Sequence, residues 1–318
     1  LDAGETRATI AQRHGVMVGV GGANLGVERG QICVLMGLSG SGKSTLLRAA
    51  NGLNPVTRGQ VLVADGERQV DVAHCGPTEL RRIRRGRIAM VFQQFGLLPW
   101  RSVRDNVGLG LELRGENARA RAAVVDEKLA LVGLTDAADR MVGELSGGMQ
   151  QRVGLARAFA TDADILLMDE PFSALDPLIR REMQDEFLRL QKMLKKTIIF
   201  ITHDFDEAIR LADRIGIMKD GRLVQLATPE EMVTNPADDY VREFTRNAPR
   251  DHIVSVGAIA TKGTASGKPI RAAAKIGDVA AEVLASDVPM PVVDDAGKHL
   301  GIISRAAMIA GLYPEPAA

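Results

Sequence analysis

The sequence predicts an α/β fold with a mostly parallel central sheet, and three observations support that prediction. A glycine-rich loop, Gly37–Ser44, stands between an apolar run and a segment suited to a helix. Short apolar runs then alternate with helical patterns up to about residue 218, as in parallel strands joined by helices. A helical stretch, about residues 101–160, interrupts this alternation. We therefore expect an α/β core with an inserted helical subdomain.

Composition places the chain among soluble globular proteins. It has 318 residues, 46% hydrophobic and 25% charged, enough for one large domain and a small one. Lys plus Arg and Asp plus Glu both number 40, so net charge does not indicate a nucleic-acid partner. Two cysteines are too few for a disulfide framework and suit a reducing cytoplasm. No apolar run reaches the roughly 18–20 residues of a membrane span, and no signal peptide is expected.

The loop fits the pattern G-x-x-x-x-G-K-[ST], which binds nucleoside triphosphates when it joins a strand to a helix. Ile32–Met36 is the expected strand, and the backbone N–H groups that follow it would surround phosphate oxygens. Lys43 would reach the β- and γ-phosphates, and the Ser44 hydroxyl would hold Mg²⁺. The predicted nucleotide-binding residues here are Gly37, Ser39, Gly40, Ser41, Gly42, Lys43, Ser44 and Thr45.

Polar side chains follow three further expected strands. The run Ile165–Met168 leads into Asp169, a candidate Mg²⁺ ligand, and Glu170, a candidate general base for water that attacks the γ-phosphate. His203 follows the strand at 197–202, where a contact with the γ-phosphate is favoured over a purely structural histidine. Gln93 follows Ile88–Phe92 and could bind Mg²⁺ or the water through its amide.

A second glycine loop, Ser146–Gly148, opens another predicted helix, Met149–Ala160, about a hundred residues beyond the first loop. A helix N-terminus preceded by such a loop also attracts anions. Both loops can grip one nucleotide only if the second comes from another copy of the protein. The sequence therefore predicts a two-fold dimer with two shared sites.

These motifs together resemble the ATP-binding subunits of ABC transporters, over about residues 15–245. The resemblance identifies Gly37–Ser44 as the Walker A motif, Gln93 as the Q-loop, Leu145–Gln151 as the signature, Ile165–Asp169 as Walker B, Ser173–Asp176 as the D-loop and His203 as the switch histidine. It implies ATP and Mg²⁺ as cofactors and adds Gln150 and Asp176 to the nucleotide site. ATP binding would close the dimer, with Ser146 and Gly148 of one copy facing the γ-phosphate held by the other.

The same resemblance implies a peripheral protein on the cytoplasmic face of the inner membrane. The segment Phe95–Asn106 would receive the coupling helix of a transmembrane permease, and a separate substrate-binding protein would complete the system. No nucleic-acid partner is expected. The family often places an aromatic residue against adenine; the matching position here falls near His14, with an exposed loop residue as the alternative.

Several short sequence segments narrow the resemblance to the ATP-binding subunits of quaternary-amine importers. The segments that carry it are Gly37–Gly42, Arg87–Gln93, Phe95–Pro99, Ile199–Ala208 and Gly221–Gln225. Choline is favoured as the substrate, ahead of glycine betaine and proline betaine. Residues 1–246 would form the nucleotide-binding domain. Residues 247–318 would form a small α+β tail similar to one half of a CBS-type module, which either regulates the subunit or only stabilises or dimerises it.

Three other functions are considered. An ATPase of another ABC importer shares all of the motifs. A soluble ABC ATPase of DNA repair would insert long coiled coils, and one of translation would carry two phosphate loops; neither feature occurs. A nucleotide-dependent kinase does not explain the second loop or Ser173–Asp176. The expected helix Thr78–Arg85 and the arginines at 81, 82, 84, 85 and 87 are interpreted as a solvated face, because no aromatic residues are interleaved and the net charge is zero.

Overall fold

The computed structural model describes residues 4–93 and 96–313. The chain forms two compact units, Leu1–Val224 and Gln225–Ala318. This division lies ahead of the predicted boundary between residues 246 and 247. Side-chain contacts explain why the preceding helical segment belongs with the tail: Arg250 Nη1 donates to the Val233 carbonyl at 2.9 Å, and the Glu230 carboxylate accepts from the Ser255 amide.

The first unit is built on a six-stranded sheet in the order β4-β5-β6-β1-β7-β8. The four pairs from β4 to β7 are parallel, which confirms the mostly parallel sheet. Because β1 lies between strands that come much later in the chain, helices must cross over the sheet to connect them. The strands are β1 (Ile32–Met36), β4 (Ile88–Val91), β5 (Ile165–Asp169), β6 (Thr197–Ile201), β7 (Arg214–Lys219) and β8 (Arg222–Ala227).

This strand order positions the site. The residues after β4, β5, β6 and β1 are those that the sequence singled out, and parallel neighbours end at the same edge of a sheet. Gln93, Glu170, His203 and Gly37 therefore come to one edge although they are far apart in sequence. All five residues of β1 are buried, as the continuous apolar run predicts for a central parallel strand.

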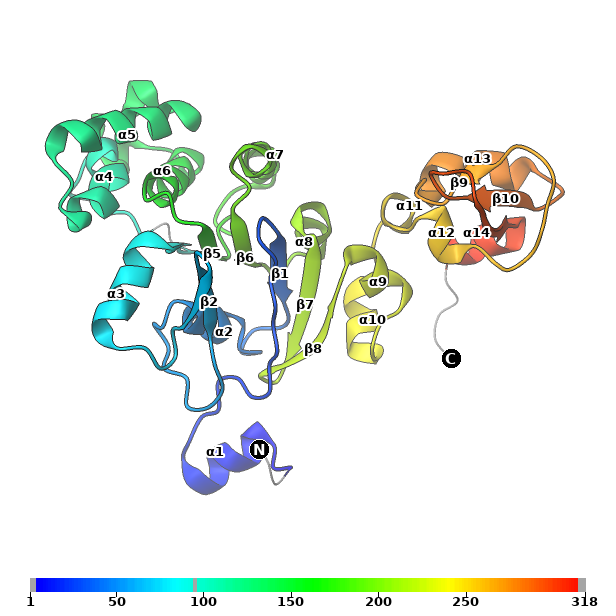
Figure 1. Cartoon of the computed structure of the whole chain (residues 1–318), viewed down its shortest axis with the longest axis horizontal. Helices are drawn as coiled ribbons and strands as arrows, with labels where there is room; N and C mark the ends of the chain where they lie inside the picture. The colour runs from blue at the N-terminus through cyan, green and yellow to red at the C-terminus, as the bar shows by residue number, and fades with distance from the viewer. Residues whose placement is uncertain (1–3, 94–95, 314–318) are drawn as a thin grey trace. The chain divides into compact units, whose positions relative to one another are not determined.

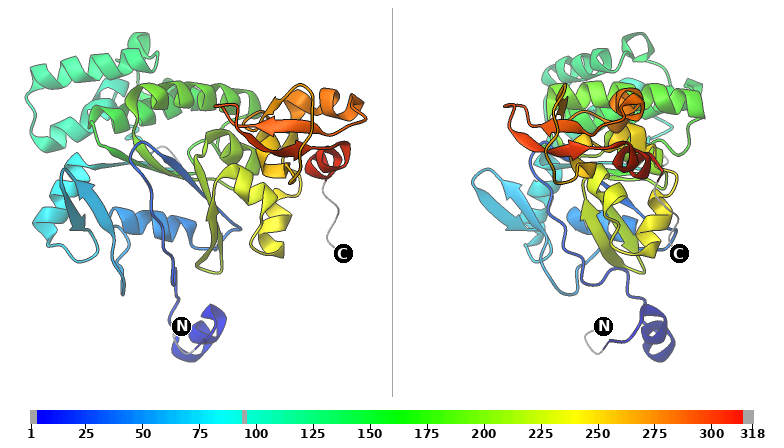
Figure 2. Two further views of the ribbon diagram at one scale, coloured as in Figure 1. Left: turned by 45° about the vertical axis from the view of Figure 1, so that its right-hand side comes forward. Right: turned by 90° about the vertical axis from the view of Figure 1, so that its right-hand side faces the viewer.

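Helices cover both sides of the sheet, with α2 on one side and α7 on the other (Figures 1 and 2). The segment between β4 and β5 is helical, as predicted, and α4, α5 and α6 pack on one another. Val125 and Leu129 bury one face of α5. The helices of the first unit are α1 (Arg7–His14), α2 (Lys43–Ala50), α3 (Pro77–Gly86), α4 (Val103–Arg114), α5 (Ala118–Leu131), η1 (Thr135–Ala137), η2 (Val142–Glu144), α6 (Gly147–Ala160), α7 (Pro177–Leu194) and α8 (Phe205–Leu211).

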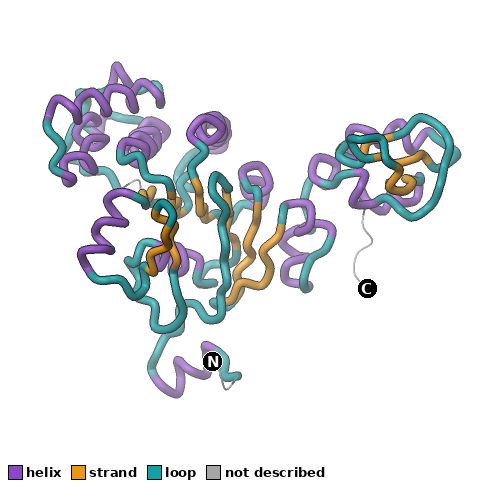
Figure 3. The backbone as a smooth tube through the Cα atoms, viewed as in Figure 1, coloured by secondary structure: helices purple, strands orange, loops and turns teal. Residues whose placement is uncertain are grey.

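Apolar and small residues alternate over residues 16–36, which predicts short strands leading to the phosphate loop; β1 confirms the last of them, and the prediction is wrong for the residues before it. Residues 15–31 run as a loop in Figure 3. The segment crosses the phosphate loop instead of pairing in a sheet: the Gly21 amide donates to the Gly221 carbonyl at 2.8 Å. Gly22 and Gly30 adopt positive φ, which interrupts an extended backbone.

A two-stranded antiparallel hairpin, β2 (Leu62–Asp65) and β3 (Arg68–Asp71), carries the charge partners of the arginine-rich helix α3. Asp65 accepts hydrogen bonds from Arg82, Arg87 and Arg68. These guanidinium groups, that of Arg82 first, hold the pKa of Asp65 far below its usual range. Arg82 and Arg87 therefore serve to fasten the helix to the hairpin and the sheet.

The second unit contains the strand, turn, strand and helix that the tail pattern predicts. Its three-stranded sheet has the order β11-β10-β9. Residues 252–288 contain β9, which pairs with β10 in the same small sheet, and α13, which packs on α14. The elements are α9 (Pro229–Thr234), α10 (Asp239–Thr245), α11 (Arg250–Ile253), α12 (Val256–Ile259), β9 (Ile270–Arg271), α13 (Ile276–Ala285), β10 (Met290–Val293), β11 (His299–Ile303) and α14 (Arg305–Leu312).

Within residues 4–93 and 96–313, the structure contains no helix that is both long and apolar enough to cross a membrane.

Candidate functional site

The phosphate loop between β1 and α2 requires glycine where the backbone turns most sharply. Gly37 has φ +143°, and a Cβ atom there would lie 2.2 Å from the Met218 carbonyl oxygen. Gly42, the N-cap of α2, has φ +102°, and its Cβ would lie 2.7 Å from the Gly19 carbonyl oxygen. Both contacts are with backbone atoms that cannot move aside cheaply. The loop is therefore held close to its neighbouring segments, as a phosphate cradle requires.

Gly37→Ala should destabilise the protein by at least about 2 kcal/mol, because the backbone overlap adds to the strain of positive φ. Gly86→Ala, at the end of α3, is the matched control: its Cβ meets nothing within 4 Å and its φ is not positive. Urea denaturation of both variants checks this prediction. Equal unfolding midpoints for the two variants would contradict it.

The loop side chains divide by burial. The Lys43 ammonium donates to the Gly37 carbonyl at 2.7 Å and to the Leu38 carbonyl at 3.0 Å. Burial lowers the pKa of Lys43, while the nearby Glu170 and Asp169 act against that shift. Ser41 is buried, and its hydroxyl has no partner among the described residues. An unpaired buried hydroxyl and an ammonium that donates only to backbone carbonyls can both donate hydrogen bonds to phosphate oxygens. Ser39 is exposed, and Thr45 is half-buried at the start of α2.

Two predicted Mg²⁺ ligands meet directly. The Ser44 hydroxyl donates to Asp169 Oδ1 at 2.9 Å, and Arg48 Nη2 donates to Asp169 Oδ2 at 3.1 Å. Mg²⁺ is usually held by one or two carboxylates together with phosphate oxygens and water. Among the described residues, no three or more His, Cys, Asp or Glu side chains form a group that could hold a metal ion. Sequence reasoning missed Arg48, although its i,i+4 spacing from Ser44 places both on one helix face.

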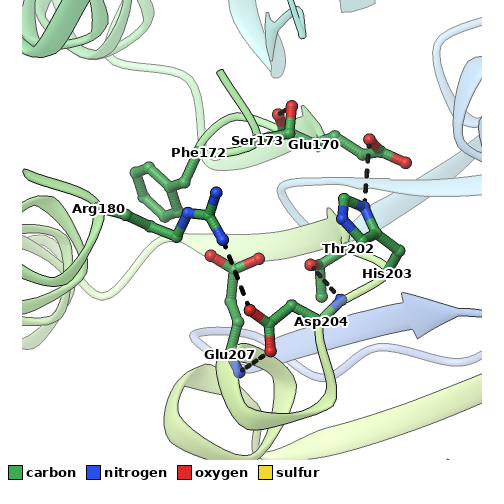
Figure 4. Close-up of a pocket in the computed structure, with 8 residues that line it drawn as sticks. All are labelled: Glu170, Phe172, Ser173, Arg180, Thr202, His203, Asp204 and Glu207. Carbon is green, nitrogen blue, oxygen red and sulfur yellow. Dashed lines mark hydrogen bonds and ion pairs between the residues drawn. The ribbon is translucent and has the colours of Figure 1, made fainter. Parts of the chain in front are cut away.

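Two of the three predicted catalytic residues meet the carboxylate of the third, Glu170. Gln93 Nε2 donates to Glu170 Oε2 at 3.1 Å. His203 Nδ1 lies 3.5 Å from the same oxygen (Figure 4). Glu170 has φ +47°, an unusual conformation for a residue other than glycine. Its backbone is held there because its amide donates to the Ile201 carbonyl at 3.1 Å. A carboxylate in this setting can orient a water molecule and accept its proton.

The second predicted loop lies apart from the first within one chain: Figure 1 shows α6 away from α2. Ser146 and Gly147 are exposed, and Ser146 caps α6 by accepting from the Met149 amide. The packing of Gly148 against α7 is close, because a Cβ atom there would lie 2.8 Å from Ile179. The chain therefore leaves the N-terminus of α6 open to solvent.

Two residues that the resemblance adds to the nucleotide site have internal roles here. Gln150 Nε2 donates to the Leu145 and Val142 carbonyls, so its amide holds its own loop. Asp176 caps α7 by accepting from the Ile179 amide at 3.1 Å. Any contact of these two side chains with a nucleotide remains a prediction.

The structure does not bring His14 to the phosphate loop. His14 ends α1 with its side chain 61% exposed, and its recorded partner is Glu5, at 3.8 Å. At the other end of the helix, Arg7 donates to the Val18 carbonyl at 2.5 Å and the Gly40 carbonyl at 3.4 Å. Counting back along the sequence from Asn24 and Leu25 pointed to His14 and did not single out Arg7.

A small cavity of about 10 Å³ lies beside the catalytic cluster (Figure 4). Its lining residues are Glu170, Phe172, Ser173, Arg180, Thr202, His203, Asp204 and Glu207. Glu207 is buried and accepts from Gln184 Nε2 at 2.8 Å. Burial raises the pKa of the Glu207 carboxyl, against the lowering effects of Thr202 and Gln184.

Glu207→Gln should make the free energy of unfolding less dependent on pH. The pKa of Glu207 in the folded protein is raised above its ordinary 4.5, so its contribution to stability is present below that pH and lost as the pH rises through the folded value. The variant should therefore gain stability relative to the parent as the pH rises from 4.5 through the folded-state pKa of Glu207. Thermal melts across this range test it, with the exposed Glu182→Gln on α7 as the control. A stability difference that does not change with pH would contradict it.

The predicted permease-facing segment begins at Phe95, which lies outside the described residues. From Gly96 onward a buried amide holds it: Asn106 Nδ2 donates to the Leu98 carbonyl at 3.0 Å, and Asn106 Oδ1 accepts from the Leu98 amide at 2.8 Å. Trp100 is 71% exposed on this fixed segment.

The chain is similar in sequence to known ABC transporter proteins. A family model described as "ABC transporter" matches residues 20–173. The trimethylamine N-oxide transport system ATP-binding protein TmoW of Ruegeria pomeroyi is 49% identical, over 92% of this chain and 85% of that protein. The glycine betaine/proline betaine transport system ATP-binding protein ProV of Escherichia coli is 52% identical, over 82% of this chain and 64% of that protein.

A solved bacterial ABC transporter cassette resembles the fold. Its dimeric structure has 33% sequence identity and a TM-score of 0.59, and covers 66% of this chain and 90% of that chain. The same cassette bound to ADP and phosphate gives 32% identity and a TM-score of 0.58, with the same coverage of both chains.

Proposed function

The chain belongs to the ABC transporter family, and on that premise we propose that it hydrolyses ATP to drive uptake of a quaternary amine through a separate membrane permease. It is an ABC-type ATPase by fold and by family. The observation that carries the proposal is the meeting of Gln93 and His203 at the Glu170 carboxylate, beside the Ser44–Asp169 pair.

The residues present fit ATP with Mg²⁺. Ser44 and Asp169 would hold the ion, and Gln93 would join them from the end of β4. Mg²⁺ would neutralise charge on the phosphate oxygens during transfer. Glu170 would take the proton of the attacking water, and His203 would contact the γ-phosphate. Lys43 would exchange its loop carbonyl partners for phosphate oxygens.

A dimer would complete each site with Ser146–Gly148 of a second copy. The exposed N-terminus of α6 supports this arrangement, as does the dimeric assembly of the related cassette. Ser146→Arg and Lys43→Met should each be inactive alone. Mixing them should restore part of the activity, because one site of the mixed dimer combines Lys43 of one chain with Ser146 of the other. No recovery on mixing would overturn the shared site.

The permease contact is proposed for Phe95–Asn106, with the exposed Trp100 as its anchor. This placement implies a peripheral protein on the cytoplasmic face of the inner membrane, working with a substrate-binding protein. Co-purification of a polytopic membrane protein, lost with Trp100→Glu but kept with the exposed Leu113→Glu on α4, tests the contact. Purification without such a partner would favour a soluble ABC ATPase instead.

The relatives support a quaternary amine or a closely related methylated amine as the class of substrate. Choline within that class stays a prediction, with glycine betaine and proline betaine next. Uptake of labelled choline, glycine betaine and trimethylamine N-oxide should be compared in cells that lack this subunit and in cells that regain it. Glu170→Gln serves as the inactive control. Restored uptake of glycine betaine but not choline would overturn the choline assignment.

A further inference from the structure

Arg180, near the start of α7, lies between the two segments that carry Glu170 and His203. Its Nη2 donates to the Leu175 carbonyl at 3.1 Å, in the loop just before the helix. Its Nη1 lies 3.6 Å from Asp204 Oδ2. Figure 4 shows the guanidinium reaching toward Asp204, with a dashed line between them. One side chain thus joins the loop after β5 to the residue that directly follows His203.

Asp204 is firmly placed by its own backbone contacts. Its Oδ1 accepts from the Asp206 amide at 3.0 Å and the Glu207 amide at 3.2 Å, so it caps α8. Its amide donates to Thr202 Oγ1 at 3.0 Å. His203 therefore lies between Thr202 and Asp204, which are joined by this hydrogen bond. A shift of Asp204 would shift His203 as well.

The other end of the loop is fixed to Glu170. The Ser173 hydroxyl donates to the Glu170 carbonyl at 2.9 Å, and the Ser173 amide donates to it at 3.3 Å. Four non-covalent contacts therefore form a closed ring together with the backbone. They join Glu170 to Ser173, Leu175 to Arg180, Arg180 to Asp204, and His203 to Glu170.

The Arg180 side chain is partly buried where it makes this connection. Its side chain is 27% exposed, and its buried Nε atom has no hydrogen-bond partner among the described residues. Its two terminal nitrogens contact the two ends of the bridge, and its charge also acts on Glu207, a buried carboxyl that lines the same cavity. A partly buried ion pair is screened less than one in open solvent, so it can hold a geometry.

We propose that Arg180 is a positioning residue for ATP hydrolysis: by bridging the Leu175 carbonyl and Asp204 it sets His203 against Glu170. This role rests on the proposed function of His203 and Glu170. Arg180 itself would touch neither nucleotide nor water. Its loss should therefore change the rate of the chemical step and leave nucleotide binding in place.

A double-mutant cycle on the full chain tests the proposal. Arg180→Ala should lower kcat by about tenfold, with the KM for ATP within about twofold of the parent. In a His203→Ala background the same change should lower residual single-turnover hydrolysis by less than about twofold, because the residue to be positioned is gone. Arg180→Lys should recover part of kcat. Arg181→Ala, its exposed neighbour on α7, is the control and should retain activity.

Asp204→Asn isolates the ion pair without removing the helix cap, because asparagine also accepts at the N-cap. It should lower kcat in the same direction as Arg180→Ala, and the double variant should be no worse than Arg180→Ala alone. This second variant also decides the matter if Arg180→Ala fails to fold.

Equal loss of kcat from Arg180→Ala with and without His203 would overturn the proposal, as would a rise in the KM for ATP with kcat unchanged. Full activity of His203→Ala would instead refute the assigned role of His203 and with it the proposed mechanism. The two failures are therefore distinguishable.

Discussion

Glu170→Gln is expected to lower the rate of ATP hydrolysis by about 10²–10³-fold while ATP binding is retained. The amide has the size of the carboxylate but cannot accept a proton from water. Its oxygen can still accept from Gln93 Nε2, which lies 3.1 Å from the carboxylate, so the loop geometry should persist. Phosphate release under single-turnover conditions measures the rate, and equilibrium binding of ATP measures affinity.

The dimer offers a second measurement on the same variant. If ATP closes two chains and hydrolysis separates them, Glu170→Gln should accumulate as a dimer in ATP and as a monomer in ADP. Glu182→Gln, exposed on α7, is the matched control and should behave as the parent. Hydrolysis by Glu170→Gln within about fivefold of the parent rate would show that another group takes the proton.

Lys43→Met is expected to weaken ATP binding by about 100-fold or more, since two hydrogen bonds from a charged donor are lost. The ammonium now occupies the loop, donating to the Gly37 and Leu38 carbonyls, where phosphate oxygens would take over. Methionine keeps the apolar length of the side chain and removes the charge. Titration of ATP against intrinsic or labelled fluorescence gives the dissociation constant.

The stability of the nucleotide-free Lys43→Met protein should not fall, although its ATP binding is weakened. Burial lowers the pKa of Lys43, which means that the charged form is disfavoured in the folded chain. Removing that charge should leave the melting temperature unchanged or raise it. Lys192→Met, exposed on α7, controls for the general effect of the exchange. A variant that binds ATP as the parent does would exclude Lys43 from the phosphate site.

Local patterns in the sequence were sufficient for the elements and for most of the site. The apolar run Ile32–Met36 predicted a buried strand, and the glycines after it predicted a tight phosphate loop. The structure has a buried strand there, followed by glycines with positive φ. The strand–turn–strand–helix pattern of the tail also appears where it was predicted. These features depend on neighbours in the chain, so the chain alone predicts them.

Contacts between distant segments were not predictable in this way. Alternation over residues 16–36 suggested strands, yet the residues before β1 form a loop that closely approaches Gly42 and Gly221 through the Gly19 carbonyl. The same loop displaced His14 and placed Arg7 at Gly40. The division between the two compact units lies before the predicted boundary for a similar reason: α9 is hydrogen-bonded to residues beyond 249.

From its sequence alone, the protein was determined to be a nucleotide-binding α/β chain with polar residues at the ends of particular strands. Only the tertiary structure decided that those ends meet. The order β4-β5-β6-β1 brings Gln93 and His203 to either side of Glu170, although each belongs to a different strand. Strand order depends on which distant surfaces pack together, and that free energy has no local signature. The bridge from Arg180 to Asp204 arises from the same packing.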